Sequence, residues 1–275
     1  MPESPEVQIL AEFLGERLAG RQVQDVDLIE FRSLKTRARP LSSLVGSEVV
    51  SARRIGKHVD LALSGGELVV SLGRHGWMRW SDDAPGDPDP EAPPALAAFT
   101  FDDGGVLEAT DAGDWVSLGL SVVDAADEVA AVAKLGPDPA DDAFTRDDFD
   151  RAVVGRRKQI KAILQEQESL SGIGNAYSDE ILHAAKVSPV AHAAALDGGS
   201  LDRVYERTIG VVRDAITARR GIPIDQLKSA KTAAMRVHGR AGEACPVCGD
   251  TIRGFTFAST TAEYCPTCQT AGVLL

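Results

Sequence analysis

The sequence contains no run of about 18 apolar residues, the length that spans a bilayer. Its first residues, Met1-Pro2-Glu3-Ser4-Pro5-Glu6, lack the basic and then apolar pattern of a secretory signal. We therefore expect no membrane partner and a cytoplasmic location. Hydrophobic residues still make up 44% of the chain, which is ordinary for a soluble protein, and 275 residues are enough for two compact domains or for one domain plus appendages.

Positive charge is also scarce. The chain has 29 Lys and Arg against 41 Asp and Glu, a formal net charge of −12. This balance argues against a nucleic-acid-binding protein, whose binding domain is usually basic. The two signs are segregated, however, with acid in residues 82–91, 102–103 and 138–142 and base in residues 53–57, 156–161 and 228–240. Segregation permits a basic groove on an acidic protein; the alternative is that each cluster is a solvated face.

Cysteine is missing from the first 244 residues and then occurs as two Cys-x-x-Cys pairs. The pairs are Cys245 with Cys248 and Cys265 with Cys268, separated by 16 residues. This spacing predicts one tetrahedral zinc ion with four thiolate ligands. Such a closed site has no place for a substrate, so the zinc is expected to be structural. The alternative, two disulfides, is disfavoured by a reducing cytosol.

Hydrophobic periodicity divides the chain into a mainly β and a mainly α part near residue 140. An amphipathic helix is predicted over residues 5–18, ending at Gly20. Short strands are predicted at 23–29, 49–55, 59–63, 68–72, 99–101 and 115–123. Helices are predicted after the cap Thr145, at 149–154, 160–168, 176–185 and 201–216. The stretch 81–94 holds five of the 14 prolines and is expected to be an exposed loop.

The segment Gly172-Ile173-Gly174-Asn175 lies between two predicted helices. Its glycines let the backbone approach a ligand, and the amides at the next helix start can bind a phosphate, with Asn175 as an additional donor. Taken alone, the pattern is better explained by a simple interhelical turn.

Four motifs carry a resemblance that spans the chain. They are Pro2-Glu3 with Pro5-Glu6-Val7; Gly56-Lys57; Gly172-Ile173-Gly174-Asn175 with Tyr177, Asp179-Glu180 and Ser188-Pro189; and Val237-His238-Gly239-Arg240 before the cysteines. In this order the motifs resemble the formamidopyrimidine-DNA glycosylase and endonuclease VIII family.

The resemblance implies an α+β fold: an N-terminal helix with a two-sheet β-sandwich, a helix-two-turn-helix domain and a C-terminal β-hairpin zinc finger. We expect a catalytic domain at 1–125, a linker at 126–142, the helix-two-turn-helix domain at 143–235 and the finger at 236–275. The implied activity is base-excision repair by a bifunctional glycosylase and abasic-site lyase. The partner would be damaged double-stranded DNA, and the protein would be a monomer associated with the nucleoid.

Four residues are predicted to carry the chemistry. Removal of Met1 would leave Pro2 with a secondary amine, whose ordinary pKa near 8 leaves a nucleophilic fraction at neutral pH. Glu3 is expected to act as general acid, with support from Glu6, although acids in a first helical turn also simply complement the helix dipole. Lys57 is expected to reach the target phosphate and the leaving group; otherwise it is a surface lysine in a hairpin turn.

Six further residues are expected to contact DNA: Arg74, His75, Lys161, Asn175, His238 and Arg240. The chain also departs from the family. Arg74 stands where family members have a methionine that fills the space left by the extruded base. Trp115 lies in the segment where the family has an Arg and Phe wedge, and it could be a core residue instead. Thr260 stands in place of an arginine of the family's zinc finger, which would bind phosphates.

These departures favour a runner-up, a non-catalytic protein that binds damaged DNA on the same scaffold. A third interpretation is a zinc-ribbon module of the transcription or translation machinery. It explains only the last 40 residues and leaves Pro2-Glu3 and the Gly172 to Asn175 turn without a role.

Overall fold

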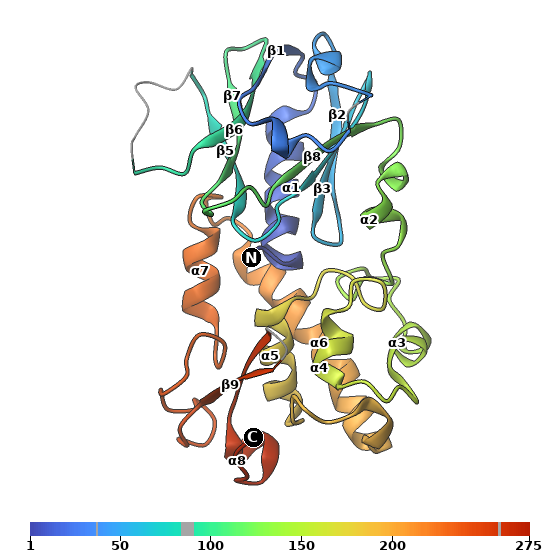
Figure 1. The fold of residues 1–275 in the computed structure, drawn as a ribbon, viewed down its shortest axis with the longest axis vertical. Helices are drawn as coiled ribbons and strands as arrows, with labels where there is room; N and C mark the ends of the chain where they lie inside the picture. The colour runs from blue at the N-terminus through green and yellow to red at the C-terminus, as the bar shows by residue number, and fades with distance from the viewer. Residues whose placement is uncertain (37, 84–90, 258–259) are drawn as a thin grey trace. The chain divides into compact units, whose positions relative to one another are not determined.

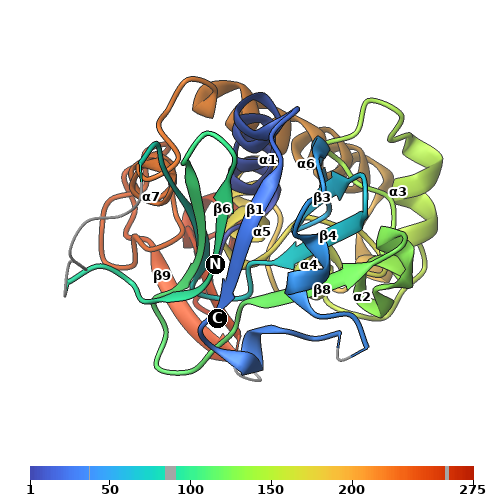
Figure 2. The same ribbon diagram turned by 90° about the horizontal axis from the view of Figure 1, so that it is seen from above.

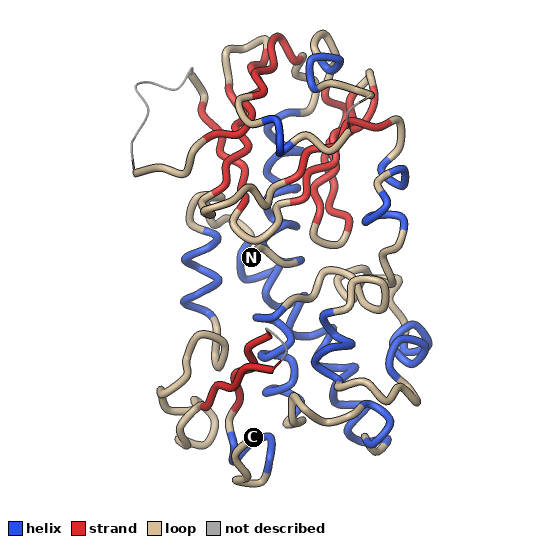
Figure 3. The backbone as a smooth tube through the Cα atoms, viewed as in Figure 1, coloured by secondary structure: helices blue, strands red, loops and turns tan. Residues whose placement is uncertain are grey.

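The computed structural model of the chain describes residues 1–36, 38–83, 91–257 and 260–275. It divides into two compact units, which are described separately (Figure 1). The β-unit consists of residues 1–2, 6–133 and 222–225; the α-unit consists of residues 3–5, 134–221 and 226–275. Figure 3 shows strands predominating in the β-unit and helices in the α-unit. In the described residues, no helix combines the length and apolar character needed to span a membrane.

The described strands of the β-unit form two antiparallel sheets. The first has the order β1 (Val23–Leu28), β6 (Ala95–Phe101), β7 (Val106–Asp111), β5 (Gly76–Ser81). The second has the order β2 (Val49–Ile55), β3 (His58–Leu63), β4 (Gly66–Ser71), β8 (Gly119–Val123), and Figure 2 shows β3, β4 and β8 side by side. Two short helical turns, η1 (Phe31–Ser33) and η2 (Leu41–Leu44), lie between β1 and β2, and two more, η3 (Ala126–Glu128) and α2 (Ala130–Ala133), follow β8.

Helix α1 (Ser4–Leu18) contacts strands of both sheets. Its apolar side chains at three- and four-residue spacing, Val7, Leu10, Leu14 and Leu18, are fully buried. Gly15 lies close to Ala52 on β2, and the Arg17 guanidinium lies 5.2 Å from the ring centroid of Trp80 on β5. This packing fixes the helix that follows Pro2 and Glu3.

The α-unit contains six α-helices and one hairpin within the described residues. They are α3 (Arg146–Val153), α4 (Ile160–Gln165), α5 (Asn175–Ala185), α6 (Gly198–Arg219), α7 (Leu227–Ala234), α8 (Pro266–Thr270) and the strands β9 (Arg253–Phe257) and β10 (Thr260–Tyr264), with a short turn η4 (Ala193–Ala195). Thr145 caps α3 as predicted, because its hydroxyl accepts from Asp148 N while Asp148 accepts from Thr145 N.

The predicted α+β class, with two sheets, helices and a C-terminal hairpin, is confirmed. Two strands, β5 and β7, and the helix α7 were not predicted. Residues 115–118 lie in a loop rather than in the predicted strand, which begins only at Gly119. Of the predicted acidic loop, residues 84–90 lie outside the described residues.

Phe149 is the clearest test of packing in the α-unit, because its ring is fully buried and its centroid lies 5.6 Å from that of Tyr205. We expect Phe149→Ala to lower the free energy of unfolding by about 3–5 kcal/mol, measured by urea denaturation. Val154→Ala, at a side chain that is 51% exposed, is the control and should stay within about 0.5 kcal/mol of wild type. Equal effects of the two substitutions would contradict the packing.

Candidate active site, DNA-contact residues and zinc centre

The carboxylate of Glu3 lies in a cradle of backbone amides in the α-unit. Glu3 is 1% exposed, and its oxygens accept from Gly174 N, from Ala176 N at 3.0 Å and from Tyr177 N at 3.3 Å. These amides belong to the start of α5, where backbone N–H groups have no helical acceptor and the helix dipole favours an anion. The anion site predicted for this turn therefore holds the protein's own carboxylate.

Glycine at position 172 permits this arrangement. Its φ of +88° lies in the left-handed region, and a Cβ at this position would collide with the Ser4 hydroxyl. The Ser4 amide donates to the Gly172 carbonyl at 3.0 Å, so the segment after Glu3 is also bound to the turn. Glycine at position 172 is required here by the close approach of two chain segments.

Lys231 of α7 also contacts the carboxylate of Glu3. Its Nζ lies 3.2 Å from Glu3 Oε1 and 4.9 Å from the ring centroid of Tyr177. The side chain of Lys231 is 12% exposed. Sequence reasoning missed this residue, because α7 was not predicted and a lone lysine carries no motif.

Lys161 was expected to contact DNA but is buried in the α-unit. Its ammonium pairs with Asp179 and donates to Ser178 Oγ at 3.1 Å, and its side chain is 6% exposed. Burial lowers the pKa of Lys161, and the Asp179 carboxylate opposes that effect. This internal pairing does not match an exposed phosphate contact. Asn175 is half-buried, and its Oδ1 accepts from Gln165 Nε2 at 2.9 Å.

Pro2, Glu6 and Lys57 lie in the β-unit. Pro2 and Glu6 are buried at the start of the chain and in the first turn of α1, and Lys57 is half-buried. Lys57 follows Gly56 in the tight turn between β2 and β3, where Gly56 has a φ of +58°. The expected β-turn position of Lys57 is thus observed, while its reach toward a phosphate remains a prediction.

Arg74 and His75 are exposed at a turn that is bonded to the loop after β7. The amides of Arg74 and His75 donate to Ser117 Oγ at 3.0 and 3.2 Å. Ser117 Oγ in turn donates to Asp111 Oδ2 at 2.8 Å. Two segments that lie about 40 residues apart in the sequence therefore form one rigid surface.

Asp111 is 2% exposed and holds the loop after β7 in place. Its carboxylate also accepts from the amides of Gly113, Ser117 and Leu118 at 2.8–2.9 Å. Burial by itself would raise the pKa of Asp111, but these hydrogen bonds outweigh it and hold the pKa below its usual value. Trp115 on the same loop is 68% exposed, so the expectation that it could be a core residue is wrong. A braced loop that presents an exposed aromatic ring is suited to stacking.

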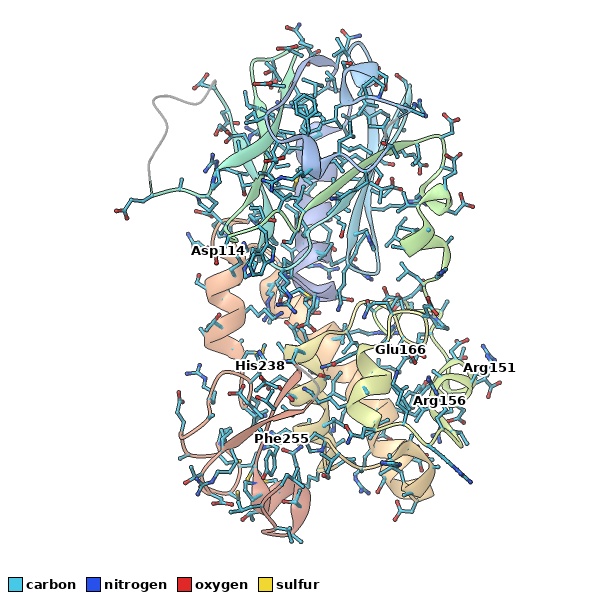
Figure 4. All side chains as sticks on the ribbon, viewed as in Figure 1. Asp114, Arg151, Arg156, Glu166, His238 and Phe255 are labelled. Carbon is cyan, nitrogen blue, oxygen red and sulfur yellow. The ribbon has the colours of Figure 1, made fainter. Side chains whose placement is uncertain are left out.

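His238 and Arg240 lie in the segment between α7 and the finger, and Figure 4 shows His238 near the β9 hairpin. Glu180 accepts from the amides of Arg236, Val237 and His238 at 2.9–3.0 Å and so fixes this segment. His238 Nδ1 lies 2.8 Å from Asp179 Oδ2, and its side chain is 30% exposed.

Arg240 donates to the carbonyls of Thr232, Ala233 and Met235 at 3.2–3.4 Å. These carbonyls end α7, so part of the donor capacity expected for DNA is used to cap a helix.

The four cysteines converge on one point. Their four Sγ atoms all lie within 4.8 Å of one another. Cys248 Sγ lies 3.3 Å from Cys265 Sγ, and Cys245 Sγ lies 3.9 Å from Cys268 Sγ. Four thiolates at this spacing fit one zinc ion, which confirms the predicted structural zinc. His183 of α5 adds an outer contact, since its Nε2 lies 3.3 Å from Cys245 Sγ. The zinc centre is thereby joined to the helix that bears the Glu3 cradle.

The chain contains the three modules of one class of protein: a two-sheet unit led by a helix, a helical unit with a glycine turn, and a four-cysteine finger. Family models match all three: the formamidopyrimidine-DNA glycosylase N-terminal domain at residues 1–114, the H2TH domain of the same enzyme at 135–225, and a zinc finger found in FPG and IleRS at 242–271. The chain belongs to the formamidopyrimidine-DNA glycosylase family.

Individual relatives agree. The formamidopyrimidine-DNA glycosylase of Heliobacterium modesticaldum is 32% identical over 98% of this chain and all of its own length. An uncharacterized formamidopyrimidine-DNA glycosylase-like protein of Mycobacterium tuberculosis is 45% identical over 51% of this chain and 88% of its own.

Solved structures show the same fold. The MutM (Fpg) protein of Thermus thermophilus has a TM-score of 0.83 at 28% identity, covering 98% of both chains. The Lactococcus lactis enzyme in complex with FAPY-dG-containing DNA has a TM-score of 0.85 at 25% identity, covering 98% of this chain and 100% of that one.

Asp111→Asn tests the braced loop. We expect a loss of about 2 kcal/mol in the free energy of unfolding at pH 7, because charged hydrogen bonds to buried amides are weakened. The pKa of Asp111 in the folded protein lies below the ordinary value of 3.8, so the stabilisation is present above that pH and is lost as the pH falls through the pKa of the folded protein. The difference between variant and wild type, measured by denaturation at pH 7 and pH 3, should therefore narrow at pH 3. An identical difference at both pH values would refute this role.

Cys265→Ser tests the zinc centre. Metal analysis of the purified wild type should give about one zinc per chain, and the variant should fall well below that value. Val273→Ala, at a side chain that is 62% exposed and outside the cluster, should retain the full zinc content. Undiminished zinc in Cys265→Ser would count against a four-thiolate site.

Proposed function

We propose that this protein is a base-excision-repair DNA glycosylase that also cleaves the strand at the abasic site. The observation that carries the proposal is the Glu3 cradle, which holds a buried carboxylate on the residue after Pro2. The same contacts that stabilise the start of α5 hold this carboxylate next in sequence to the proposed nucleophile. The family membership and the DNA complexes of solved relatives support the same conclusion.

The chemistry starts from the Pro2 amine, once Met1 has been removed. Its lone pair attacks the deoxyribose C1′ of a flipped nucleotide, and the C1′–N glycosidic bond breaks with departure of the base. Opening of the sugar ring and loss of the amine proton give an iminium. This electron sink makes the C2′ proton acidic, so the 3′ phosphate and then the 5′ phosphate leave in successive eliminations.

Protein groups would divide the remaining tasks. Glu3, buried and hydrogen-bonded by three amides, exchanges protons as the sugar opens, with Glu6 in support. Lys57 binds the target phosphate from the β2–β3 turn. Arg74, His75, Asn175, His238 and Arg240 are proposed to contact DNA, and Lys161 to act through its contacts with α5 rather than as an exposed phosphate ligand.

Damaged double-stranded DNA is the proposed partner, bound by a monomer in the nucleoid-associated cytoplasm. The bases removed are proposed to be oxidised or ring-opened, as in the FAPY-dG of the Lactococcus lactis complex. Trp115 and Arg74 are the exposed candidates for stacking in place of the extruded base. Excision rates on a panel of duplexes, each with one lesion, would rank the substrates.

Borohydride trapping tests the reaction. Wild type mixed with an abasic-site duplex and borohydride should form a covalent complex, because reduction fixes the iminium. Pro2→Gly should reduce trapping at least about tenfold, since it replaces the nucleophilic secondary amine. Mass spectrometry must show that Met1 is absent from the trapped protein; a retained Met1 in an active protein would disprove attack by Pro2.

A non-catalytic protein that binds damaged DNA is the second candidate. It is favoured by the internal pairing of Lys161 and by Arg74 at the position of the family's methionine. Thr260, which replaces the finger arginine, has a side chain outside the described part of the chain. Tight binding of abasic-site duplex by wild type without any trapping or strand cleavage would establish this candidate.

A further inference from the structure

Helix α7 brings one positive charge to the Glu3 cradle. Lys231 Nζ lies 3.2 Å from Glu3 Oε1, and the side chains of Lys231 and Glu3 are 12% and 2% exposed. Two nearly buried opposite charges at this distance interact far more strongly than a surface pair. The contact lies wholly within the α-unit.

A second contact fixes the direction of the lysine. Its ammonium lies 4.9 Å from the ring centroid of Tyr177, and the amide of Tyr177 donates to Glu3 Oε2 at 3.3 Å. Tyr177 is 1% exposed, so its ring is held in place by the surrounding side chains. The Lys231 ammonium thus lies between the Tyr177 ring and the Glu3 carboxylate, and the backbone amide of Tyr177 binds that same carboxylate.

The helix itself is anchored at both ends. Leu227 at its start is fully buried, and Arg240 donates to the carbonyls of Thr232 and Ala233 at its end. The position of Lys231 is therefore set by the fold of the α-unit, and the side chain needs little further ordering to meet Glu3.

The charges define what Lys231 does. Three amides and the Lys231 ammonium contact the Glu3 carboxylate and favour its ionised form, and the buried Lys161 ammonium adds a Coulombic interaction of the same sign. An ionised, immobile carboxylate on the residue next to Pro2 can accept the proton that the Pro2 amine loses when it bonds to C1′. The carboxylic acid so formed can then return the proton as the sugar opens.

We propose that Lys231 is a positioning residue for the reaction, acting through Glu3: it keeps the carboxylate that adjoins the nucleophile in the sequence ionised and in place. The proposal rests on the proposed function. It assigns a role in the active site to a helix that carries none of the sequence motifs.

Kinetics on abasic-site duplex test the proposal. Lys231→Met should slow single-turnover iminium formation at least about tenfold, while the Kd for the duplex changes less than about threefold. Lys231→Arg, which keeps the charge, should restore a large part of the rate. Lys228→Met, which removes the same charge from an exposed position of α7, is the matched control and should leave the rate within about threefold of wild type.

A rate for Lys231→Met within about twofold of wild type would overturn the proposal. So would a rate loss that is explained entirely by weaker binding. A cycle with Glu3→Gln adds a second criterion: Lys231→Met should have little further effect on the rate once the carboxylate is gone, and equal effects in both backgrounds would show that Lys231 does not act through Glu3.

The double-mutant cycle of Lys231→Met and Glu3→Gln can also be followed through the midpoints of unfolding, a measurement that does not depend on enzymatic activity. Lys231→Met and Glu3→Gln should be non-additive, because the two groups are in contact. If wild type forms no iminium at all, the proposed function fails, while a non-additive stability cycle still supports the contact. Additive midpoint shifts would overturn the contact itself.

Discussion

The buried carboxylate of Glu3 is the constraint on which the arrangement of the α-unit depends. A nearly unexposed carboxylate without partners would cost several kcal/mol. Here three amides at the start of α5, which have no acceptor within the helix, donate hydrogen bonds to the Glu3 carboxylate. The carboxylate and the amides thus each gain the partner that burial requires. The requirement acts over about 170 residues of sequence, and it explains why the turn needs glycine at 172, where Ser4 approaches. Glu3, Ser4 and the glycine turn therefore form one structural element.

The charge distribution bears on how a protein with a negative net charge can bind a polyanion such as DNA. Many basic side chains are paired within the protein, such as Arg53 with Asp60, Arg79 with Glu108 and Lys161 with Asp179. These pairs cancel in the sum, so the formal net charge of −12 does not tell how the remaining charges are distributed over a binding surface. Basic side chains that do contact phosphates would release counterions from DNA, so this part of the binding should weaken as salt rises.

Sequence periodicity predicted the elements whose pattern is local. Helix α1, the Thr145 cap and the cysteine cluster each follow from spacing within a few residues, and all were predicted correctly. Strands β5 and β7 were missed because their burial is continuous or nearly so, as in Val106–Asp111, which leaves no alternation to detect. Helix α7 was missed because its apolar face is short. The partners of Glu3, Asp111 and Lys161 could not be predicted, since each depends on tertiary contacts between segments without a shared pattern.

Arg240 links two parts of the α-unit that sequence alone would treat separately. It precedes Cys245 by five residues, and its guanidinium closes the carbonyl end of α7. Whatever holds the four thiolates together therefore also steadies the helix that carries Lys231. Loss of the four-thiolate centre would therefore remove one support from the carbonyl end of α7, while the buried Leu227 at the other end of the helix would still hold it.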